Sequence, residues 1–134
     1  MVGVKIALED DVVIPVYATA GSSGLDLKAN LKAPLVIEPG SIVCVPTGIR
    51  LQIPVDYEVQ IRPRSGLALN YGITVLNTPG TIDSDYHHEI KVILINHGQE
   101  KYVVNPRDRI AQMVLGKVEK MEFEKVDQIL RTLS

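Results

Sequence analysis

Short apolar runs, broken at close intervals by Pro and Gly, constrain the fold of this chain more than any other feature. Tyr57–Arg62 alternates apolar and polar residues, as a half-buried strand does. Further runs of strand type are Val12–Tyr17, Leu25–Ala29, Leu35–Ile37, Ile42–Val45, Ile49–Ile53, Ile73–Leu76, Glu89–Asn96, Tyr102–Val104 and Arg109–Leu115. Many short strands with this punctuation predict an all-β barrel or sandwich.

Three segments refine this expectation. Ser65–Gly72 has the only helical pattern, with Ser65 as a suitable N-cap and Gly72 as a suitable residue just past the helix end. The nearly continuous apolar stretch in Glu89–Asn96 predicts a strand covered on both faces. After Leu115 the sequence becomes charged, so we expect residues 1–118 to form the domain and residues 119–134 to form an exposed extension.

Composition limits the class of protein. The chain has 134 residues, of which 46% are apolar and 22% charged, enough for one globular domain with its own core. The formal net charge of −2 provides no basic field for a nucleic-acid backbone. A single nucleotide needs only a few local cations, so a nucleotide remains compatible with this charge.

The number of cysteines and the lengths of the apolar runs limit the redox chemistry and the location of the protein. Cys44 is the single cysteine, so a disulfide within the chain is excluded, and its apolar surroundings predict a buried, inert thiol. No apolar run approaches the length of a membrane span and the N-terminus lacks a signal-peptide pattern. We therefore expect a cytoplasmic protein without a membrane partner.

The segment Pro63–Ala68 interrupts the strand pattern and places Arg64 and Ser65 at the start of the expected helix. Backbone N–H groups and the helix dipole favour an anion at such a position. The alternative is a capping Ser beside a surface Arg, and spacing alone favours this plainer interpretation.

The segment Asn77–Tyr86 delivers Asp83, Asp85 and Tyr86 beside a buried strand. A carboxylate here can orient and deprotonate a water molecule, and a Tyr can stack on a ring. The alternative is a hairpin loop in which both Asp residues serve as turn formers. The residues alone leave the two interpretations about even.

Three further positions carry weaker signals. Asp26 follows a loop of small residues and either holds Mg²⁺ through water or serves as an edge-strand charge. Arg109 and Gln112 lie on one strand, and strict alternation places them on opposite faces unless the strand bends. The three His residues have no metal-binding spacing, which favours structural or exposed roles.

Taken together, four segments resemble the motifs of the trimeric dUTP pyrophosphatase family, in the family's order. The segment Gly80–Tyr86 is almost fully matched, and the resemblance runs from about Val12 to Leu115. It implies a jelly-roll-like β-barrel with one short helix, assembled as a homotrimer with active sites shared between subunits. The motifs are Ala20–Ala29, Pro63–Ala68, Asn77–Glu89 and Arg109–Leu115.

The resemblance implies hydrolysis of dUTP to dUMP and pyrophosphate, which keeps uracil out of DNA and supplies dUMP for dTMP synthesis. Asp83 matches the catalytic aspartate that activates a water for attack on the α-phosphorus. Tyr86 matches the residue that packs under the deoxyribose and would clash with a ribose 2′-OH. Asn77 matches a uracil-binding position, and Gly80, Thr81 and Ile82 supply nearby backbone groups that read the base.

The resemblance also assigns the phosphates and the metal. Arg64, Ser65 and Gly66 match positions that hold the phosphates of a neighbouring subunit's substrate, and Gln112 matches a further phosphate contact. Mg²⁺ is the implied cofactor, bound mainly by the phosphates, with Asp26 reaching it through water.

Two departures from the family pattern are visible. His88 stands where the family usually has Gly, so the turn either does without a positive φ or is strained. The family's Gly-rich C-terminal motif is not found before Ser134. Without that arm we expect turnover to fall sharply, and appending an arm from an active relative should restore it. We expect the extension from residue 119 to reach a neighbouring subunit.

Two rival functions remain open. A non-catalytic trimer that binds or senses dUTP would bind the nucleotide without releasing pyrophosphate. A dCTP deaminase-like enzyme would release ammonia, but the pattern from Asp83 to Tyr86 fits hydrolysis better.

Overall fold

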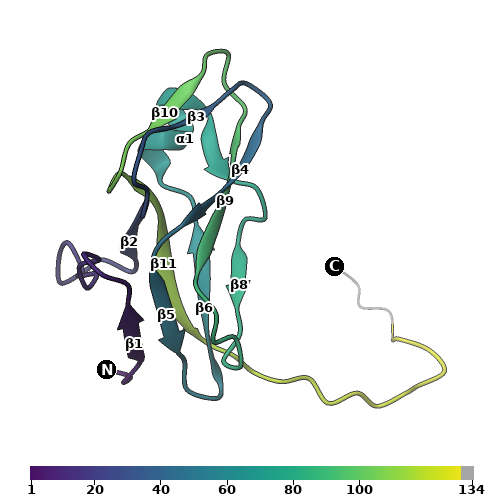
Figure 1. Ribbon diagram of the computed structural model, residues 1–134. Coiled ribbons are helices and arrows are strands. Elements are labelled where there is room, and N and C mark those ends of the chain that lie inside the picture. The colour runs from purple at the N-terminus through teal and green to yellow at the C-terminus, as the bar shows by residue number, and fades with distance from the viewer. Residues whose placement is uncertain (131–134) are drawn as a thin grey trace.

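The computed structural model describes residues 1–130 and holds antiparallel strands with one short helix over that range. Figure 1 shows the strands forming an elongated body from which the C-terminal segment runs away. The elements are β1 (Lys5–Leu8), β2 (Leu25–Lys28), β3 (Leu35–Ile37), β4 (Ile42–Pro46), β5 (Ile49–Gln52), β6 (Tyr57–Arg62), α1 (Ser65–Tyr71), β7 (Ile73–Val75), β8 (Gly80–Ile82), β9 (Lys91–Asn96), β10 (Tyr102–Val104) and β11 (Arg109–Lys117).

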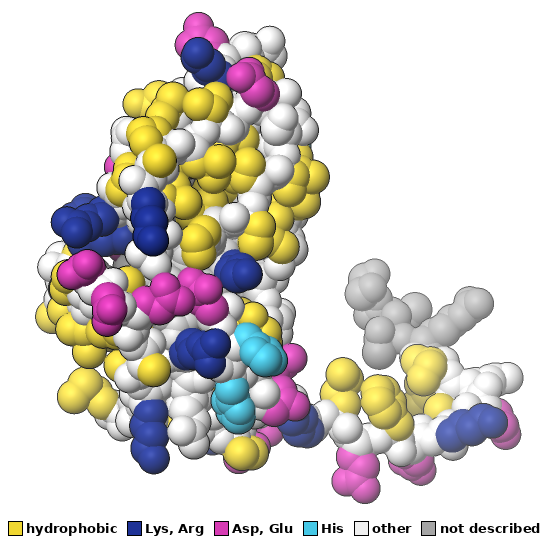
Figure 2. Space-filling model, in the orientation of Figure 1, with side chains coloured by type: hydrophobic (Ala, Val, Ile, Leu, Met, Phe, Trp, Pro, Cys, Tyr) yellow, Lys and Arg dark blue, Asp and Glu magenta, His cyan; other side chains and the backbone are white. Residues whose placement is uncertain are grey.

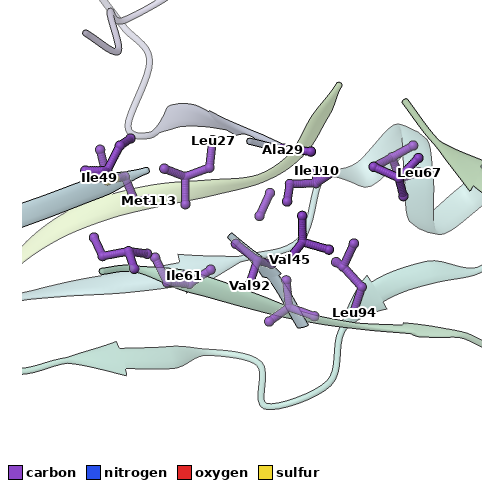
Figure 3. Packing of buried hydrophobic residues seen from close by; sticks show 14 of the residues in the cluster. Leu27, Ala29, Val45, Ile49, Ile61, Leu67, Val92, Leu94, Ile110 and Met113 are labelled. Carbon is purple, nitrogen blue, oxygen red and sulfur yellow. The ribbon is translucent and has the colours of Figure 1, made fainter. Parts of the chain in front are cut away.

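Two larger sheets and two strand pairs make up the body. The four-stranded sheet has the order β2-β11-β6-β8 and the three-stranded sheet the order β4-β9-β7, while β1 pairs with β5 and β10 with β3. Each alternating strand turns its apolar face inward, and Figure 3 shows side chains of both sheets, among them Leu27, Met113 and Leu94, gathered in one core. The predicted all-β, barrel-like class with one helix is confirmed.

Most predicted strands are confirmed to within a residue or two, but one predicted strand is absent and two observed strands were not predicted. Val12–Tyr17 forms no strand, whereas Lys5–Leu8 and Gly80–Ile82, which were not predicted as strands, do. The helix is confirmed, but its N-cap is Arg64 instead of Ser65. Gly72 ends it in the left-handed conformation with φ 70°, which glycine adopts without steric cost.

The outer face of the β4-β9-β7 sheet is apolar. Ile42 is 56% exposed, Ile93 and Ile95 are half-buried, and hydrophobic side chains spread over this face in Figure 2. The prediction that Glu89–Asn96 is covered on both faces is therefore wrong for the single chain. The prediction of a buried Cys44 is also wrong: the apolar run has two faces, and Cys44 is exposed on the outer one.

The segment after β11 leaves the body. Val118 donates its backbone N–H to the Asp56 carbonyl at 2.8 Å, and residues 119–130 form no strand or helix. Met121 and Phe123 are 81% and 85% exposed. The predicted extension 119–134 is described as far as residue 130, and the remainder lies outside the described residues. No helix among the described residues has the length and apolarity needed to cross a membrane.

Candidate active site

The third motif begins in the turn between β7 and β8. β8 pairs with β6, opposing Ile82 to Val59 and Gly80 to Ile61. A Cβ at Gly80 would meet Ile61 at 3.2 Å and the Asn77 side-chain amide at 3.4 Å. The absence of a side chain at residue 80 therefore lets the Asn77 amide lie against the strand, close to the backbone of Gly80.

Asp83 follows β8 directly and is exposed, and a tight turn connects it to Tyr86. The Tyr86 backbone N–H donates to the Asp83 carbonyl at 3.1 Å, and the Tyr86 hydroxyl donates to the Glu89 carbonyl at 2.9 Å. The Glu89 carboxylate in turn accepts from the backbone N–H of Gly48 at 2.8 Å. These bonds fix the half-buried Tyr86 relative to Asp83 and fasten the turn to the body.

His88 occupies this turn without unusual backbone geometry. The residues other than Gly with positive φ in the described range are Asp11, Asp56 and Arg107. The turn thus does without the positive φ that a Gly would permit. The His88 ring meets the Tyr86 ring edge to face, with centroids 5.6 Å apart and planes at 72°.

A second cluster assembles from β2, the β6–α1 connection and β11. The Asp26 carboxylate lies 3.3 Å from Nε of Arg64 and 3.8 Å from Nε of Arg109. An Arg64 guanidinium N–H also donates to the Arg109 carbonyl at 3.5 Å. Because two guanidinium groups share one carboxylate, the cluster has an excess positive charge and suits an anion.

A β-bulge brings Gln112 to this cluster. Arg109 pairs with Lys28 and Ala111 with Leu27, so Ile110 is the extra residue in β11. The two consecutive residues Ile110 and Ala111 are buried, and alternation resumes one position later. Arg109 and Gln112 therefore share a face, and the expectation of opposite faces without a bend is corrected by this bulge.

Close packing positions the Gln112 amide. Its Nε2 donates to the Pro63 carbonyl at 3.0 Å, next to Arg64 in the chain. A Cβ at Gly24 would lie 2.5 Å from Oε1 of Gln112. Ser65 and Gly66, in the first turn of α1, are exposed beside this cluster.

Tyr102 of β10 borders the same cluster and packs against Tyr71 of α1, with ring centroids 5.0 Å apart and planes tilted by 51°. Burial raises the pKa of the Tyr102 hydroxyl above its ordinary value. The negative charge of Asp108 and the neighbouring Tyr71 add to this rise, and the Arg64 guanidinium opposes it. Tyr102 is therefore neutral at physiological pH.

The two clusters lie at opposite ends of β6. Ile82 opposes Val59, which places Asp83 beside Glu58, whereas Arg64 follows the other end of the strand. Glu58 and Arg64 are six positions apart in the sequence, which corresponds to roughly 20 Å at the rise of a strand. The triphosphate of one nucleotide is far too short to connect Asp83 and Arg64 of the same chain.

The surroundings of Asp83 are acidic. A hollow of about 460 Å³ beside it is lined by Asp56, Glu58 and Asp85 together with the single cation Lys120. These carboxylates would repel a free phosphate, so the hollow of one chain by itself does not suit a phosphate group. Among residues 1–130, no three His, Cys, Asp or Glu side chains lie together as a metal site.

Comparison with known sequences decides the family. The dUTPase family model matches residues 10–133. The chain belongs to the dUTPase family. A deoxyuridine 5′-triphosphate nucleotidohydrolase of Fusobacterium nucleatum is 48% identical over 128 residues, covering 96% of this chain and 88% of its own length. One of Chlamydia abortus is 54% identical over 121 residues, covering 90% and 82%.

Solved dUTPase structures share the fold. The dUTPase of Staphylococcus bacteriophage 80alpha with dUPNHPP superposes with a TM-score of 0.85 at 18% identity, covering 95% of this chain and 89% of that one. A mutant dUTPase from phage phi11 of S. aureus, described with a structural Mg(II) ion, gives a TM-score of 0.84 at 18% identity, covering 95% and 98%. This likeness supports the β-barrel architecture of the dUTPase family.

The supporting residues of this candidate site were not predicted from the sequence. Arg109 was separated from Gln112 by strict alternation, although the apolar pair Ile110-Ala111 is the sequence signal of the bulge. Gly24 and Gly48 were not singled out, because their partners Gln112 and Glu89 are distant in sequence.

Proposed function

We propose that this chain hydrolyses dUTP to dUMP and pyrophosphate, with Asp83 activating the attacking water. The observation that carries the proposal is the folded third motif, in which a short turn ties the Asp83 carbonyl to the backbone of Tyr86. Membership of the dUTPase family supports the substrate. The reaction keeps uracil out of DNA and supplies dUMP for dTMP synthesis.

Asp83 acts as the general base. Its exposed carboxylate, at the end of β8, accepts a proton from a water molecule, whose oxygen then attacks the α-phosphorus as pyrophosphate leaves. The backbone bond between Tyr86 and Asp83 holds the carboxylate-bearing turn in place. Positioning the water accounts for a large part of the rate enhancement, because attack by a bound water is effectively unimolecular instead of bimolecular.

The base and sugar bind along the same motif. The Asn77 amide and the backbone of Gly80, Thr81 and Ile82 face the uracil and read its polar edge. A nucleobase that leaves these polar groups without hydrogen-bond partners binds much more weakly than uracil. The Tyr86 ring packs under the deoxyribose, where a ribose 2′-OH would clash.

The phosphates bind the second cluster. Arg64, Ser65, Gly66 and Gln112 contact phosphate oxygens, and the excess positive charge around Asp26 supports this role. Mg²⁺, when bound, neutralises the triphosphate and makes pyrophosphate a better leaving group. Because the Asp26 carboxylate already pairs with two guanidinium groups, Asp26 would reach the ion through water and the phosphates would supply the direct ligands.

The active unit is a homotrimer with shared sites. Within one chain, Asp83 and Arg64 lie at opposite ends of β6. This separation supports a site in which a second copy supplies the phosphate-binding residues. The exposed apolar face of the β4-β9-β7 sheet suits burial against another copy. Met121 and Phe123 alternate with Glu122 and Glu124, so the extension suits pairing with a neighbouring subunit as a strand.

The test is pyrophosphate release from dUTP with Mg²⁺ by the wild-type chain and by Asp83→Asn, with dTTP, dCTP and UTP as controls. We expect release from dUTP and a loss of at least about a hundredfold in Asp83→Asn, since the variant lacks the base. An Asp85→Asn variant is the matched control and should remain active. Undiminished activity in Asp83→Asn, or ammonia release from dCTP, would overturn the proposal.

A further inference from the structure

The environment of Tyr86 contains a contact that the third motif does not require. The Tyr86 backbone is held by the Asp83 carbonyl and its hydroxyl by the Glu89 carbonyl. The two hydrogen bonds hold the backbone N–H and the hydroxyl, but neither fixes the rotation of the ring about its long axis. At the ring itself, Tyr86 forms an edge-to-face aromatic pair with His88, at a centroid distance of 5.6 Å and an interplanar angle of 72°.

This contact is specific to the residue type at position 88. A Gly there, as in the usual family pattern, would bring no ring to Tyr86. His88 is exposed and has no positive φ, so neither core packing nor turn geometry explains its side chain. Edge-to-face aromatic pairs prefer this geometry because the positive edge of one ring meets the negative face of the other.

We propose that His88 is a positioning residue that holds the Tyr86 ring in the orientation on which the deoxyribose packs, and so sharpens discrimination against ribonucleotides. The inference rests on the proposed function, in which Tyr86 lies under the sugar. A ring held before binding loses less freedom when the sugar arrives, which tightens binding of the matching sugar. A looser ring can tilt away from a 2′-OH and tolerate it.

The adjacent His87 provides a matched control. It is exposed like His88 and lies in the same turn, but it faces the groove beside Lys5 and Arg50 instead of the Tyr86 ring. His87→Gly and His88→Gly introduce the same backbone freedom at neighbouring positions. Only the second removes the aromatic contact, so the pair separates ring support from general loosening of the turn.

The experiment measures the KM for dUTP hydrolysis and the inhibition constant of UTP as a competitor, in wild type, His88→Gly, His88→Phe and His87→Gly. In His88→Gly we expect the ratio of the UTP inhibition constant to the dUTP KM to fall about two- to tenfold, the range of an aromatic pair. His88→Phe, which keeps a ring edge, and His87→Gly should retain the wild-type ratio. Thermal unfolding of each variant reports whether the fold is intact.

The outcomes are distinct. An unchanged ratio in His88→Gly, an equal fall in His87→Gly, or no retention in His88→Phe would overturn the role of His88 while dUTP hydrolysis stands. No hydrolysis of dUTP by the wild-type chain would overturn the proposed function, and the inference with it.

Discussion

The turn Asn77–Glu89, which we propose binds the base, and the cluster around Asp26, which we propose binds the phosphates, are built in different ways. The turn from Asn77 to Glu89 is one continuous segment, and its internal bonds join residues a few positions apart, such as Asp83 with Tyr86. The phosphate cluster joins Asp26, Arg64 and Gln112, which come from three parts of the chain. A local segment carries its geometry in its own sequence, whereas a distributed cluster depends on strand register.

The difference extends to charge. Asp83 lies in an acidic hollow, where the carboxylates of Asp56 and Glu58 repel phosphate. The cluster around Arg64 and Arg109 has the opposite character. Within one chain, the acidic surroundings of Asp83 and the positive cluster around Arg64 are therefore separate electrostatic environments.

Of the substitutions that test this difference between the two regions, removal of the Asp26 carboxylate should cause the largest loss of activity. Asp26→Ala frees the Arg64 and Arg109 side chains, and we expect the kcat/KM for dUTP to fall on the order of a hundredfold, because small misplacements of binding groups are costly. Steady-state kinetics at several Mg²⁺ concentrations measures this loss.

The Mg²⁺ series distinguishes two roles of Asp26. Rescue at high Mg²⁺ would assign the loss to metal binding, and a loss independent of Mg²⁺ would assign it to the arginines. Asp10→Asn, at an exposed turn residue, is the control. Normal kinetics in Asp26→Ala would contradict the idea that the distributed cluster is the more fragile region.

Glu89→Ala tests the support of the local turn. The variant removes the acceptor for the Gly48 N–H, and we expect the free energy of unfolding to fall by about 1.5–3 kcal/mol, the range for a hydrogen bond to a charged group. Urea denaturation measures it, with Glu122→Ala on the extension as the control. An unchanged midpoint would show that the turn is stable without its tie to the body.

Gly24→Ala is a finer test of the cluster. The added Cβ forces the Gln112 amide away from its bond with Pro63, and we expect the KM for dUTP to rise about fivefold, the equivalent of one hydrogen bond. Gly21→Ala is the matched control because a Cβ there meets nothing within 4 Å. Equal KM values for the two variants would show that Gly24 does not position the Gln112 amide for phosphate binding.

Tyr102 should give the smallest effect. Its pKa is raised in the folded chain, so above the ordinary value of 10.0 the unfolded chain loses its proton first and stability falls as the pH rises. The contribution is fully present below that pH. Tyr102→Phe should therefore flatten the decline of the unfolding free energy in alkaline solution. If the unfolding free energy of Tyr102→Phe declines as steeply as that of the wild type, other titratable groups cause the decline.

The sequence alone determined the features that depend on neighbours along the chain. Alternation in Tyr57–Arg62 predicted β6 to the residue, and Gly72 ended the helix as expected. The order of the motifs pointed to the family, which the comparisons confirm. Local sterics and hydrophobic periodicity act over a few residues, and a sequence displays them directly.

The tertiary structure decided the features that depend on pairing across the fold. The bulge at Ile110 moved Gln112 onto the face of Arg109, and the register of β2 with β11 set Asp26 between two guanidinium groups. The exposure of Cys44 depended on which face of β4 the second sheet covered. Strand register and sheet packing are set by the burial of many distant side chains at once, and no single stretch of sequence encodes that balance.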